Sequence, residues 1–369
     1  MSRRRADAEP PPPLYALVVP GLEAVAAEEI AQELGGEVKK TAPGLVVFRV
    51  PEITDAVRRL RTTEDVFLLA WGTDKLTRRA EDLDKIRRWT AHEADWHKLL
   101  RIHHAVRPKP AGKPTYHLVT QMQGHHAYRR VDAGKELARG LAGKFPASWR
   151  PAEEHAAVEV WLTIDGAAAV CGLRLSDRAM RHRTYKLEHL PASLRPTVAA
   201  AMVRLAGAGP GQVVLDPMCG AGTILAEQLA AARHAGIRLR VIGGDLERNA
   251  VKTAAINLRR LGDAWLARWD AARLPLPDAA VDRVITNPPF GKQLATPAQV
   301  GPLYRRVLRE CDRVLRPGGQ AAVLVSDFGA LRAAARRVGW QPGRRLELRV
   351  LGQRAVLSVW RKEGPAATI

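Results

Sequence analysis

The sequence predicts an α/β protein, with a doubly wound, mostly parallel sheet in its C-terminal half and a smaller α+β region before it. Strand and helix patterns alternate regularly over residues 194–327, which is typical of parallel strands joined by crossover helices. Two strand patterns joined by a short turn follow at 344–351 and 354–361, and they predict an antiparallel pair at one edge. Of the 369 residues 46% are hydrophobic, which is enough for a core in two or three domains.

The first folded piece is expected at residues 14–77. Its strand patterns lie at 14–20, 45–50 and 65–73, and its helix patterns lie at 21–36 and 52–62. Units of this length suit a small α+β layer. The charged residues 78–98 are expected to be helical, and "VRPKPAGKP" at 106–114 interrupts regular structure.

The second piece, residues 115–183, is rich in positive charge. Its elements are expected to be a strand at 115–123, a basic amphipathic helix at 129–145 and a hairpin at 156–175. The hairpin turns at Asp165-Gly166, a strong turn signal. Basic side chains here are interleaved with Tyr128 and Tyr185, and acids are sparse, which favours an RNA-facing surface over a merely solvated one. The candidate RNA-binding residues are Arg129, Arg130, Lys135, Arg139, Lys144, Arg181 and Arg183.

The third piece carries the β/α alternation. Helices are expected at 194–207, 221–236, 247–262 and 302–319, and strands at 212–217, 239–245, 264–270, 281–289 and 320–327. In an open sheet of this kind, ligands bind outside the carboxyl ends of the parallel strands. Polar residues and glycines at the ends of these strands are therefore the candidate ligand-binding residues.

The charge balance bears on partners. The chain has 58 Lys and Arg residues against 38 Asp and Glu, a formal net charge of +20. Basic side chains gain Coulomb energy from phosphates and release counterions on binding them, so a polyanionic partner is expected. The alternative is a compositional bias toward Arg that aids solubility.

Metal and membrane sites are not expected. The three cysteines are far apart, so neither a disulfide framework nor a metal-binding pair is predicted, and reduced thiols fit a cytoplasmic protein. The histidine pairs at 103–104 and 125–126 lack partners at metal-binding spacing. No apolar run approaches the ~20 residues of a membrane span. The basic, Pro-rich start, residues 1–13, is expected to be a disordered arm rather than a signal peptide.

The first strand-end motif is "LDPMCGAGTI" at 215–224. Gly220 and Gly222 allow a tight turn and close approach of the backbone to a ligand, and Asp216 ends the strand. A dinucleotide site would have a third glycine where Leu225 stands. That departure, and the acid before the glycines, argue against a pyrophosphate ligand. They fit a cationic, amino-acid-bearing nucleoside such as S-adenosylmethionine, whereas a structural turn is the alternative.

Two more acids end the next strands. Asp245 closes "VIGGD", where its carboxylate can accept both hydroxyls of a ribose or cap the following helix. Asp270 follows "AWLARW" and can accept from an adenine amino group, with the backbone of Ala271 beside it. Three acids at three successive strand ends favour one nucleoside site.

The last strand end reads "TNPPFG" at 286–291. The side-chain carbonyl of Asn287 and the backbone carbonyl of Pro288 can accept both hydrogens of an exocyclic amine and aim its lone pair at a methyl donor. The two prolines stiffen the corner, and Phe290 offers a face for a flipped base. A structural Pro-Pro turn with a plugging Phe is the alternative.

These motifs resemble a known family. "DPMCGAGT" and "NPPFG", in this order, are similar to class I S-adenosylmethionine-dependent methyltransferases that modify exocyclic amines. The order of pieces, with "LRLSDRAMRHRTYK" before "LPASLRPTVAAAM", resembles the THUMP-containing tRNA guanosine-N2 methyltransferases. The resemblance implies a ferredoxin-like domain at 14–100, a THUMP RNA-binding domain at 101–186, a Rossmann-like methyltransferase domain at 187–363 and a tail at 364–369.

The resemblance also implies the site and the partner. Asn287, Pro288 and Phe290 would hold the target amine. The cofactor would lie against Pro196, Thr197, Asp216, Gly220, Gly222, Asp245, Asp270 and Ala271. The implied substrate is tRNA, with the guanosine at position 6 of the acceptor stem as the suggested target, and a cytoplasmic monomer without metal is expected.

Other readings stay open at this stage. The amine could belong to adenine N6 in DNA or RNA, to a guanine in ribosomal RNA, or to a glutamine amide in a protein. The protein-directed reading leaves the charge of +20 unexplained. An RNA-binding protein with a decayed methyltransferase domain is the non-enzymatic alternative, and the intact glycines, acids and corner argue against it.

Overall fold

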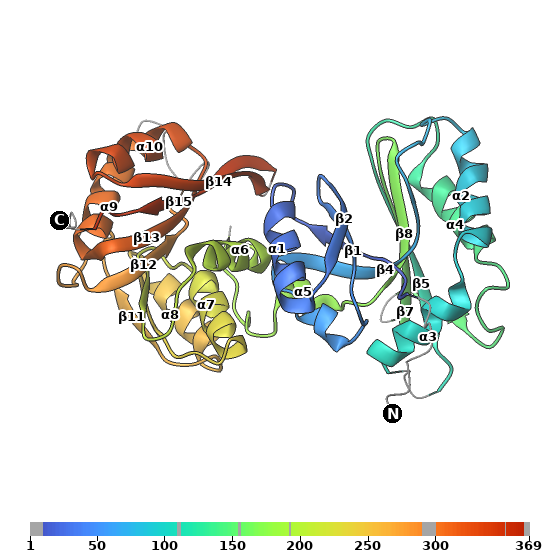
Figure 1. Ribbon diagram of the computed structural model, residues 1–369, viewed down its shortest axis with the longest axis horizontal. Helices are drawn as coiled ribbons and strands as arrows, with labels where there is room; N and C mark the ends of the chain where they lie inside the picture. The colour runs from blue at the N-terminus through green and yellow to red at the C-terminus, as the bar shows by residue number, and fades with distance from the viewer. Residues whose placement is uncertain are drawn as a thin grey trace, which may run out of the picture. The chain divides into compact units, whose positions relative to one another are not determined.

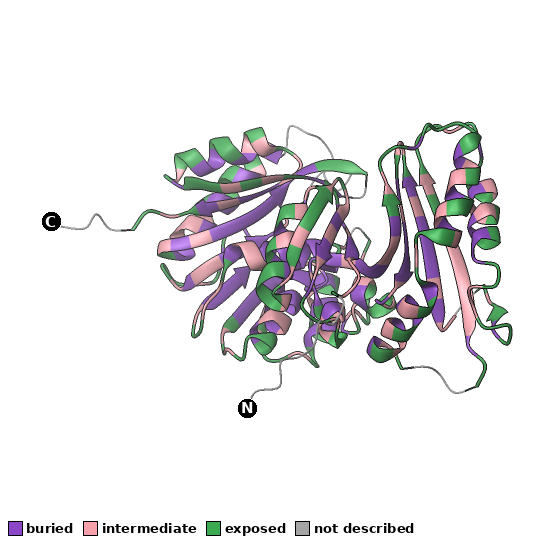
Figure 2. Ribbon diagram, turned by 45° about the vertical axis from the view of Figure 1, so that its right-hand side comes forward, coloured by how far each residue is buried: buried purple, intermediate pink, exposed green. Residues whose placement is uncertain are grey.

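The computed structural model describes residues 10–108, 112–153, 156–191, 193–289, 300–350 and 352–364 (Figure 1). The chain divides into two compact units. The first comprises residues 1–17 and 27–180, and the second comprises residues 18–26 and 181–369. Strands are mostly buried, whereas the outward faces of the helices that cover them are exposed (Figure 2).

The first unit is built on an eight-stranded sheet in the order β2-β3-β1-β4-β8-β7-β5-β6. Its strands are β1 (Leu14–Val18), β2 (Glu37–Ala42), β3 (Leu45–Arg49), β4 (Thr63–Thr73), β5 (Thr115–Gln123), β6 (Arg150–Pro151), β7 (Val158–Asp165) and β8 (Ala168–Arg174). Most neighbours are antiparallel, and β5 runs parallel to β6 and β7. β4 pairs with β8, so strands of both predicted N-terminal domains share one sheet. The division at residue 100 therefore stays a prediction.

An aromatic cluster joins three strands of this sheet. The ring of Tyr15 on β1 stacks on Phe67 of β4 with centroids 4.6 Å apart. Phe67 in turn contacts Trp161 of β7 at 5.6 Å. All three side chains are buried. Aromatic pairs at such distances add to the hydrophobic effect of their burial, and here they connect residues from both predicted domains.

Among the helices described before residue 183, one predicted helix is much shorter than expected. They are α1 (Glu23–Leu34), η1 (Asp55–Arg59), α2 (Glu81–His92), α3 (Trp96–Val106), α4 (Arg130–Gly140) and α5 (Arg178–His182). The helix predicted at 52–62 is only the short 3-10 turn η1. Thr54 caps this turn by accepting from the backbone N–H of Ala56, and Leu60 already has an extended ψ of 135°.

The second unit is built on a seven-stranded sheet in the order β11-β10-β9-β12-β13-β15-β14. Its strands are β9 (Val213–Asp216), β10 (Arg240–Asp245), β11 (Ala264–Arg268), β12 (Val281–Thr286), β13 (Leu315–Val325), β14 (Gln341–Val350) and β15 (Gln353–Arg361). The first five in this order are parallel, and β15 is antiparallel to both β13 and β14. The predicted doubly wound sheet with an antiparallel edge pair is confirmed.

Helices cover both faces of this sheet. They are α6 (Pro196–Ala206), α7 (Thr223–His234), α8 (Arg248–Leu258), α9 (Val300–Val314) and α10 (Phe328–Arg337). Successive strand residues point to opposite faces: Val214 packs in one buried cluster with α6, α7 and α8, whereas Val213 and Leu215 pack in another with α9 and α10. No helix within the described ranges combines the length and the apolar character that crossing a bilayer requires.

Candidate functional site

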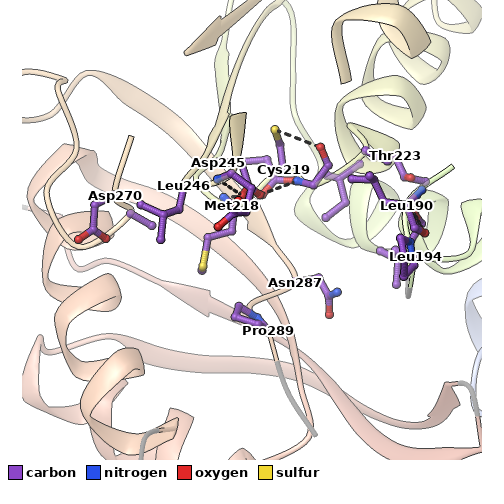
Figure 3. A pocket seen from close by; sticks show the side chains of 18 of the residues that line it. Leu190, Leu194, Met218, Cys219, Thr223, Asp245, Leu246, Asp270, Asn287 and Pro289 are labelled. Atoms are coloured by element: carbon purple, nitrogen blue, oxygen red, sulfur yellow. Dashed lines mark hydrogen bonds between the residues drawn. The ribbon is translucent and has the colours of Figure 1, made fainter. Parts of the chain in front are cut away.

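A cavity of about 450 Å³ lies at the edge of the second sheet where the parallel strands end (Figure 3). Its lining comes from the loops after β9, β10, β11 and β12, from the segment before α6 and from α9. Figure 3 shows Asp270 toward one end of the lining and Leu190 and Leu194 toward the other. The cavity is therefore where a doubly wound sheet is expected to bind a ligand.

The loop after β9 depends on its glycines. Gly222 begins α7 as its N-cap with a φ of +76°. A Cβ added there would lie 3.0 Å from the Cβ of Ala254 on α8, so any side chain would push the two helices apart. Gly220 has a φ of +51°, and its N–H donates to Oδ2 of Asp245 over 2.9 Å. The turn therefore ties the end of β9 to the end of β10 and leaves backbone exposed to the cavity.

Asp216 ends β9 with its side chain only 1% exposed. Its Oδ1 accepts from the backbone N–H of Met218 over 3.2 Å. The pKa of Asp216 is raised to about 7, mainly by burial and in smaller part by the negative charge of Asp245. A carboxylate in this position gains from a cation or a strong hydrogen-bond donor in the cavity.

Asp245 lies at the end of β10 and is half-buried. Its Oδ2 accepts from Gly220 and its Oδ1 accepts from the N–H of Glu247 over 3.0 Å. Each carboxylate oxygen can accept a further hydrogen bond, so the fixed carboxylate can still bind two ligand hydroxyls. The N-cap position of α8 is Glu247, whose side chain makes no capping hydrogen bond, so Asp245 is not the N-cap residue of this helix.

The loop after β11 carries Asp270 and Ala271. Asp270 is exposed, and its Oδ1 accepts from the N–H of Ala272 over 2.9 Å. Ala271 is buried. The indole N–H of Trp269 donates to the carbonyl of Pro217 over 2.9 Å. This bond holds the loops after β9 and β11 together, so that both reach the same cavity.

Asn287 follows β12 directly and carries an unmet hydrogen-bonding group. Its Oδ1 is shielded from solvent and has no hydrogen-bond partner among the described residues. Buried acceptors without a partner are rare and costly. Because Asn287 and Pro289 both line the cavity, an N–H donor in the cavity would satisfy this oxygen.

The structure brings most of the predicted site residues together. Asp216, Gly220, Asp245, Asp270, Ala271 and Asn287 line the cavity. Four others do not line it: Pro196, Thr197, Gly222 and Pro288. Pro196 and Thr197 form the buried first turn of α6, Gly222 shapes the loop, and Pro288 is buried. Phe290 lies outside the described residues.

The apolar wall of the cavity is not among the features predicted from the sequence. It is formed by Leu190, Pro191 and Leu194, together with Leu246 and Leu303. Leu246 could have been found, since it follows Asp245 immediately. The first three belong to the stretch "LPASL", whose pattern predicts neither helix nor strand. An apolar wall of this kind suits the flat, weakly polar face of a nucleoside base.

The predicted RNA-binding residues divide between the two units. In the first unit Arg129 forms an exposed ion pair with Asp132 over 3.1 Å, and Arg139 forms one with Glu136. Arg130 donates to the carbonyl of Thr120 over 3.3 Å. Lys135 is exposed and Lys144 is half-buried. Arg181 belongs to the second unit and is half-buried. Exposed ion pairs of this kind exchange readily for other partners.

Arg183 has a different environment. Its Nε donates to Oε1 of Glu227 over 3.0 Å, and the two side chains are 7% and 0% exposed. The hydroxyl of Tyr185 donates to the same oxygen over 2.6 Å. Loss of one partner of a buried ion pair is destabilising, because it leaves the other charge buried without compensation. The structure therefore gives Arg183 a packing role inside the second unit.

The composition of the lining fits the predicted cofactor. Four acids line the cavity, namely Asp216, Asp245, Glu247 and Asp270, and no Lys or Arg is found among its described lining residues. Such a site would repel a pyrophosphate and attract a cation. S-adenosylmethionine carries a sulfonium and an amino group, so the residues present fit this nucleoside. No group of three or more His, Cys, Asp or Glu that could hold a metal occurs in the described part of the chain.

Comparison with known proteins identifies the class. A family model described as "RMKL-like, methyltransferase domain" matches residues 183–350. The chain is 29% identical over 324 residues to the tRNA (guanine(6)-N2)-methyltransferase of Thermus thermophilus, covering 87% of this chain and 91% of that one. The chain is an S-adenosylmethionine-dependent methyltransferase. The resemblance to THUMP-containing guanosine-N2 methyltransferases is thereby confirmed.

Two further comparisons support this assignment. The crystal structure of TrmN from Thermus thermophilus matches 95% of this chain and 99% of its own with a TM-score of 0.75 and 26% identity. The mouse U6 snRNA (guanine-N(2))-methyltransferase THUMPD2 is 33% identical over 204 residues, which are 54% of this methyltransferase but only 37% of the mouse protein. The match to the bacterial enzyme thus extends over both units, whereas the match to the mouse protein covers about half of the chain.

Proposed function

We propose that this methyltransferase forms N2-methylguanosine in tRNA, with the guanosine at position 6 of the acceptor stem as its target. The observation that carries the proposal is the unpartnered Oδ1 of Asn287 at the wall of an acidic cavity. An exocyclic amine would supply the missing donor. The bacterial relative that aligns with 87% of the chain is named for this reaction at guanine 6.

The corner at the end of β12 would hold the amine. The lone pair of a guanine amino group is delocalised into the ring, so this nitrogen is a poor nucleophile. Oδ1 of Asn287 and the carbonyl of Pro288 would accept its two hydrogens, which favours a more tetrahedral nitrogen and fixes its direction. Pro288 and Pro289 have no N–H groups, so the corner offers no donor that would compete for these carbonyl oxygens.

The acidic cavity would hold the cofactor. S-adenosylmethionine supplies an electrophilic methyl group on a sulfonium. Asp216 would balance the positive charge of the cofactor, since the ionised form of this carboxylate is favoured by a nearby cation. Asp245 would accept from the ribose hydroxyls. Asp270 and the backbone of Ala271 would recognise the adenine, while the apolar wall packs against its ring.

The target base would enter the site flipped out of its helix. Phe290 is proposed as its stacking partner from its place in the motif, because an aromatic face is the usual support for a flipped base. No strong general base is needed, since methyl transfer leaves a cationic, acidic nitrogen, and one of its two protons can pass to water. Pro196 and Thr197 would support the cavity from the first turn of α6, as would Gly222 from the loop.

RNA delivery is assigned to a region that lies mostly in the first unit. The THUMP domain proposed at 101–186 would contact tRNA through basic side chains, namely Arg129, Arg130, Lys135, Arg139, Lys144 and Arg181. Arg183 is left out because its guanidinium is buried against Glu227. We further propose that the protein acts as a monomer in the cytoplasm.

A second RNA substrate is favoured by one observation. The mouse relative named for U6 snRNA is also a guanine-N2 methyltransferase, so a related chain is named for a guanine in an RNA other than tRNA. The alignment with the tRNA enzyme is longer on both chains. A guanine in ribosomal RNA and adenine N6 are the remaining alternatives, because the corner binds an amine without naming its base.

The test uses the purified protein, unmodified bulk tRNA and tritiated S-adenosylmethionine. Labelled RNA is digested to nucleosides and identified by mass spectrometry. Labelled N2-methylguanosine is expected, and a tRNA with adenosine in place of guanosine at position 6 should lose the label. Label in N6-methyladenosine would support methyl transfer to an exocyclic amine but show that the target base is adenine. Label only with U6 or ribosomal RNA would reject tRNA as the substrate.

A further inference from the structure

Two helices on the same face of the second sheet expose a group of arginines. On α9 the buried side chains form one stripe, which includes Tyr304, Val307 and Leu308, and the opposite stripe is exposed. On α10, Leu331 and Ala334 are buried in the same cluster. The exposed positions of the two helices carry six arginines, the arginine face: Arg305, Arg306, Arg309, Arg332, Arg336 and Arg337.

The arginine face is not neutralised by its own helices. None of its six side chains forms an ion pair or hydrogen bond with another described residue. α10 contains no acid. The acids of α9 are engaged elsewhere: Glu310 pairs with Arg313 and accepts from the N–H of Leu274, and Asp312 accepts from the indole of Trp340. Glu310 also interacts electrostatically with Arg309, but one acid cannot offset six guanidinium groups. The face therefore keeps a net positive charge, which favours an anionic partner.

The direction of the two helices relates this face to the active site. α9 follows β12 and α10 follows β13, and both strands end at the edge of the sheet where the cavity lies. The helices therefore begin at that edge and run away from it. Leu303, in the first turns of α9, lines the cavity itself. The arginine face starts within one turn of Leu303 and thus next to the lining of the cavity.

We infer that the arginine face binds the phosphodiester backbone of the substrate RNA beside the target nucleotide. The inference rests on the proposed function, since it assumes an RNA whose flipped base occupies the cavity. Arginine suits this role because its planar guanidinium binds phosphate oxygens in pairs. The spacing of Arg305 and Arg309, and of Arg332 and Arg336, places each pair on one side of its helix. Contacts of this kind position RNA without reading its sequence.

The test compares three variants that each remove three positive charges from exposed positions. The α9 variant is Arg305→Gln/Arg306→Gln/Arg309→Gln, and the α10 variant is Arg332→Gln/Arg336→Gln/Arg337→Gln. The control variant, Lys252→Gln/Arg259→Gln/Arg260→Gln, lies on and just after α8, whose buried side chains pack in the cluster on the other face of the sheet. Binding of labelled bulk tRNA by the full-length protein is measured by fluorescence anisotropy between 50 and 200 mM salt.

A stronger loss in the α9 and α10 variants than in the control is expected. Each should weaken tRNA binding about 10-fold or more at the lowest salt concentration, and the slope of log K against log salt should become less steep by about 2. The KM for tRNA should rise while kcat at saturating tRNA and cofactor affinity stay unchanged. Arg336 and Arg337 also lie in the last turn of α10, where cations stabilise a helix. Thermal stability is therefore measured for each variant. If the α10 variant proves to be destabilised, the test rests on the α9 variant.

Two outcomes would overturn the inference. One is tRNA binding by the α9 variant that equals binding by the control variant. The other is absence of tRNA binding by the wild-type protein. If the wild-type protein binds tRNA but transfers no methyl group to it, the proposed function fails instead, and the comparison of α9 with the control still shows whether this face binds RNA.

Discussion

The two sheets of this methyltransferase place their chemistry in different ways. In the second unit the parallel strands end at one edge, and the polar residues that follow β9, β10 and β12 line a single cavity. In the first unit most neighbouring strands are antiparallel, and the basic side chains proposed for RNA lie on and around α4, where two of them pair with nearby acids. Parallel strands thus bring polar residues together in one site, whereas the mixed sheet supports a surface of basic side chains.

The two units also differ in the surroundings of a buried ionisable group. Asp216 is buried at the cavity, where burial raises its pKa to about 7. His103 on α3 is 1% exposed, and burial, together with the charges of Arg107 and His104, lowers its pKa to about 3. Burial drives both groups toward their neutral forms. Only Asp216 faces a space that a cation can enter, so only this group is expected to change its charge when the protein works.

Replacement of Asn287 is expected to have the largest effect. Asn287→Ala removes an acceptor that stabilises the transition state, so kcat should fall by about 10²–10³. Cofactor affinity, measured by calorimetry, should stay near the wild-type value. A variant that loses cofactor affinity as much as turnover would show that Asn287 maintains the cavity rather than binding the amine.

Replacement of Asp245 should have the next largest effect. Asp245→Ala removes the proposed acceptor for the ribose hydroxyls and frees the backbone N–H of Gly220, so cofactor affinity should fall about 10- to 100-fold. Asp263→Ala, an exposed carboxylate of the same unit, serves as the control and should bind the cofactor like the wild type. Unchanged affinity in Asp245→Ala by calorimetry would remove this residue from the cofactor site.

The raised pKa of Asp216 predicts a pH-dependent cofactor affinity. Below pH 7 the carboxyl group is mostly protonated and must lose its proton before it can balance a cation. Affinity should therefore fall by up to about tenfold for each pH unit below 7 and level off above it. Calorimetry between pH 5.5 and 8.5 measures this slope. Asp216→Asn should bind weakly at every pH, and a slope retained in that variant would assign the titration to another group.

The lowered pKa of His103 predicts an effect that is absent at neutral pH and that acts on stability alone. Between pH 6.5 and 3 the unfolded chain binds one proton more than the folded chain at this position. Stability contributed by neutral His103 is thus present above pH 6.5 and is lost as the pH falls, by roughly 1.4 kcal/mol per unit. Hydrogen exchange of α3 amides should show a shallower acid dependence in His103→Leu than in the wild type. Replacement of the exposed His125 should leave the dependence unchanged, and equal slopes in all three proteins would contradict the assignment.

Sequence alone predicts which strand-end residues meet at the cavity, because the carboxyl ends of parallel strands lie at one edge of the sheet. Asp216, Asp245 and Asn287 each stand directly at the end of a strand pattern, so their convergence follows from the order of the strands. The apolar wall at Leu190 and Leu194 has no such marker, since a short irregular apolar stretch has no periodicity. Its position depends on how the segment before α6 packs, which is set by tertiary contacts.

In the basic region, buried residues are harder to distinguish from exposed residues on sequence alone. Arg183 stands in a stretch dense in Arg and His, and nothing local distinguishes it from its solvent-exposed neighbours. Its partner Glu227 is 44 residues away on α7. Similarly, β2 has the polar sequence "EVKKTA", in which every side chain is exposed or half-buried. Its pairing with β3, rather than hydrophobic alternation, makes it a strand. A partner outside the element decided both cases, one 44 residues away and one across a hairpin turn.

The pairing of β4 with β8 has a consequence for synthesis of the chain. About a hundred residues separate these two strands, so at 5–20 residues per second β8 follows β4 from the ribosome by on the order of 5–20 seconds. During that interval the hydrophobic strand "TEDVFLLAWGT" has one unpaired backbone edge, which other nascent chains can pair with. A chain truncated before Ala168 would therefore aggregate rather than form a smaller domain, and folding of the first unit waits for nearly all of it to be translated.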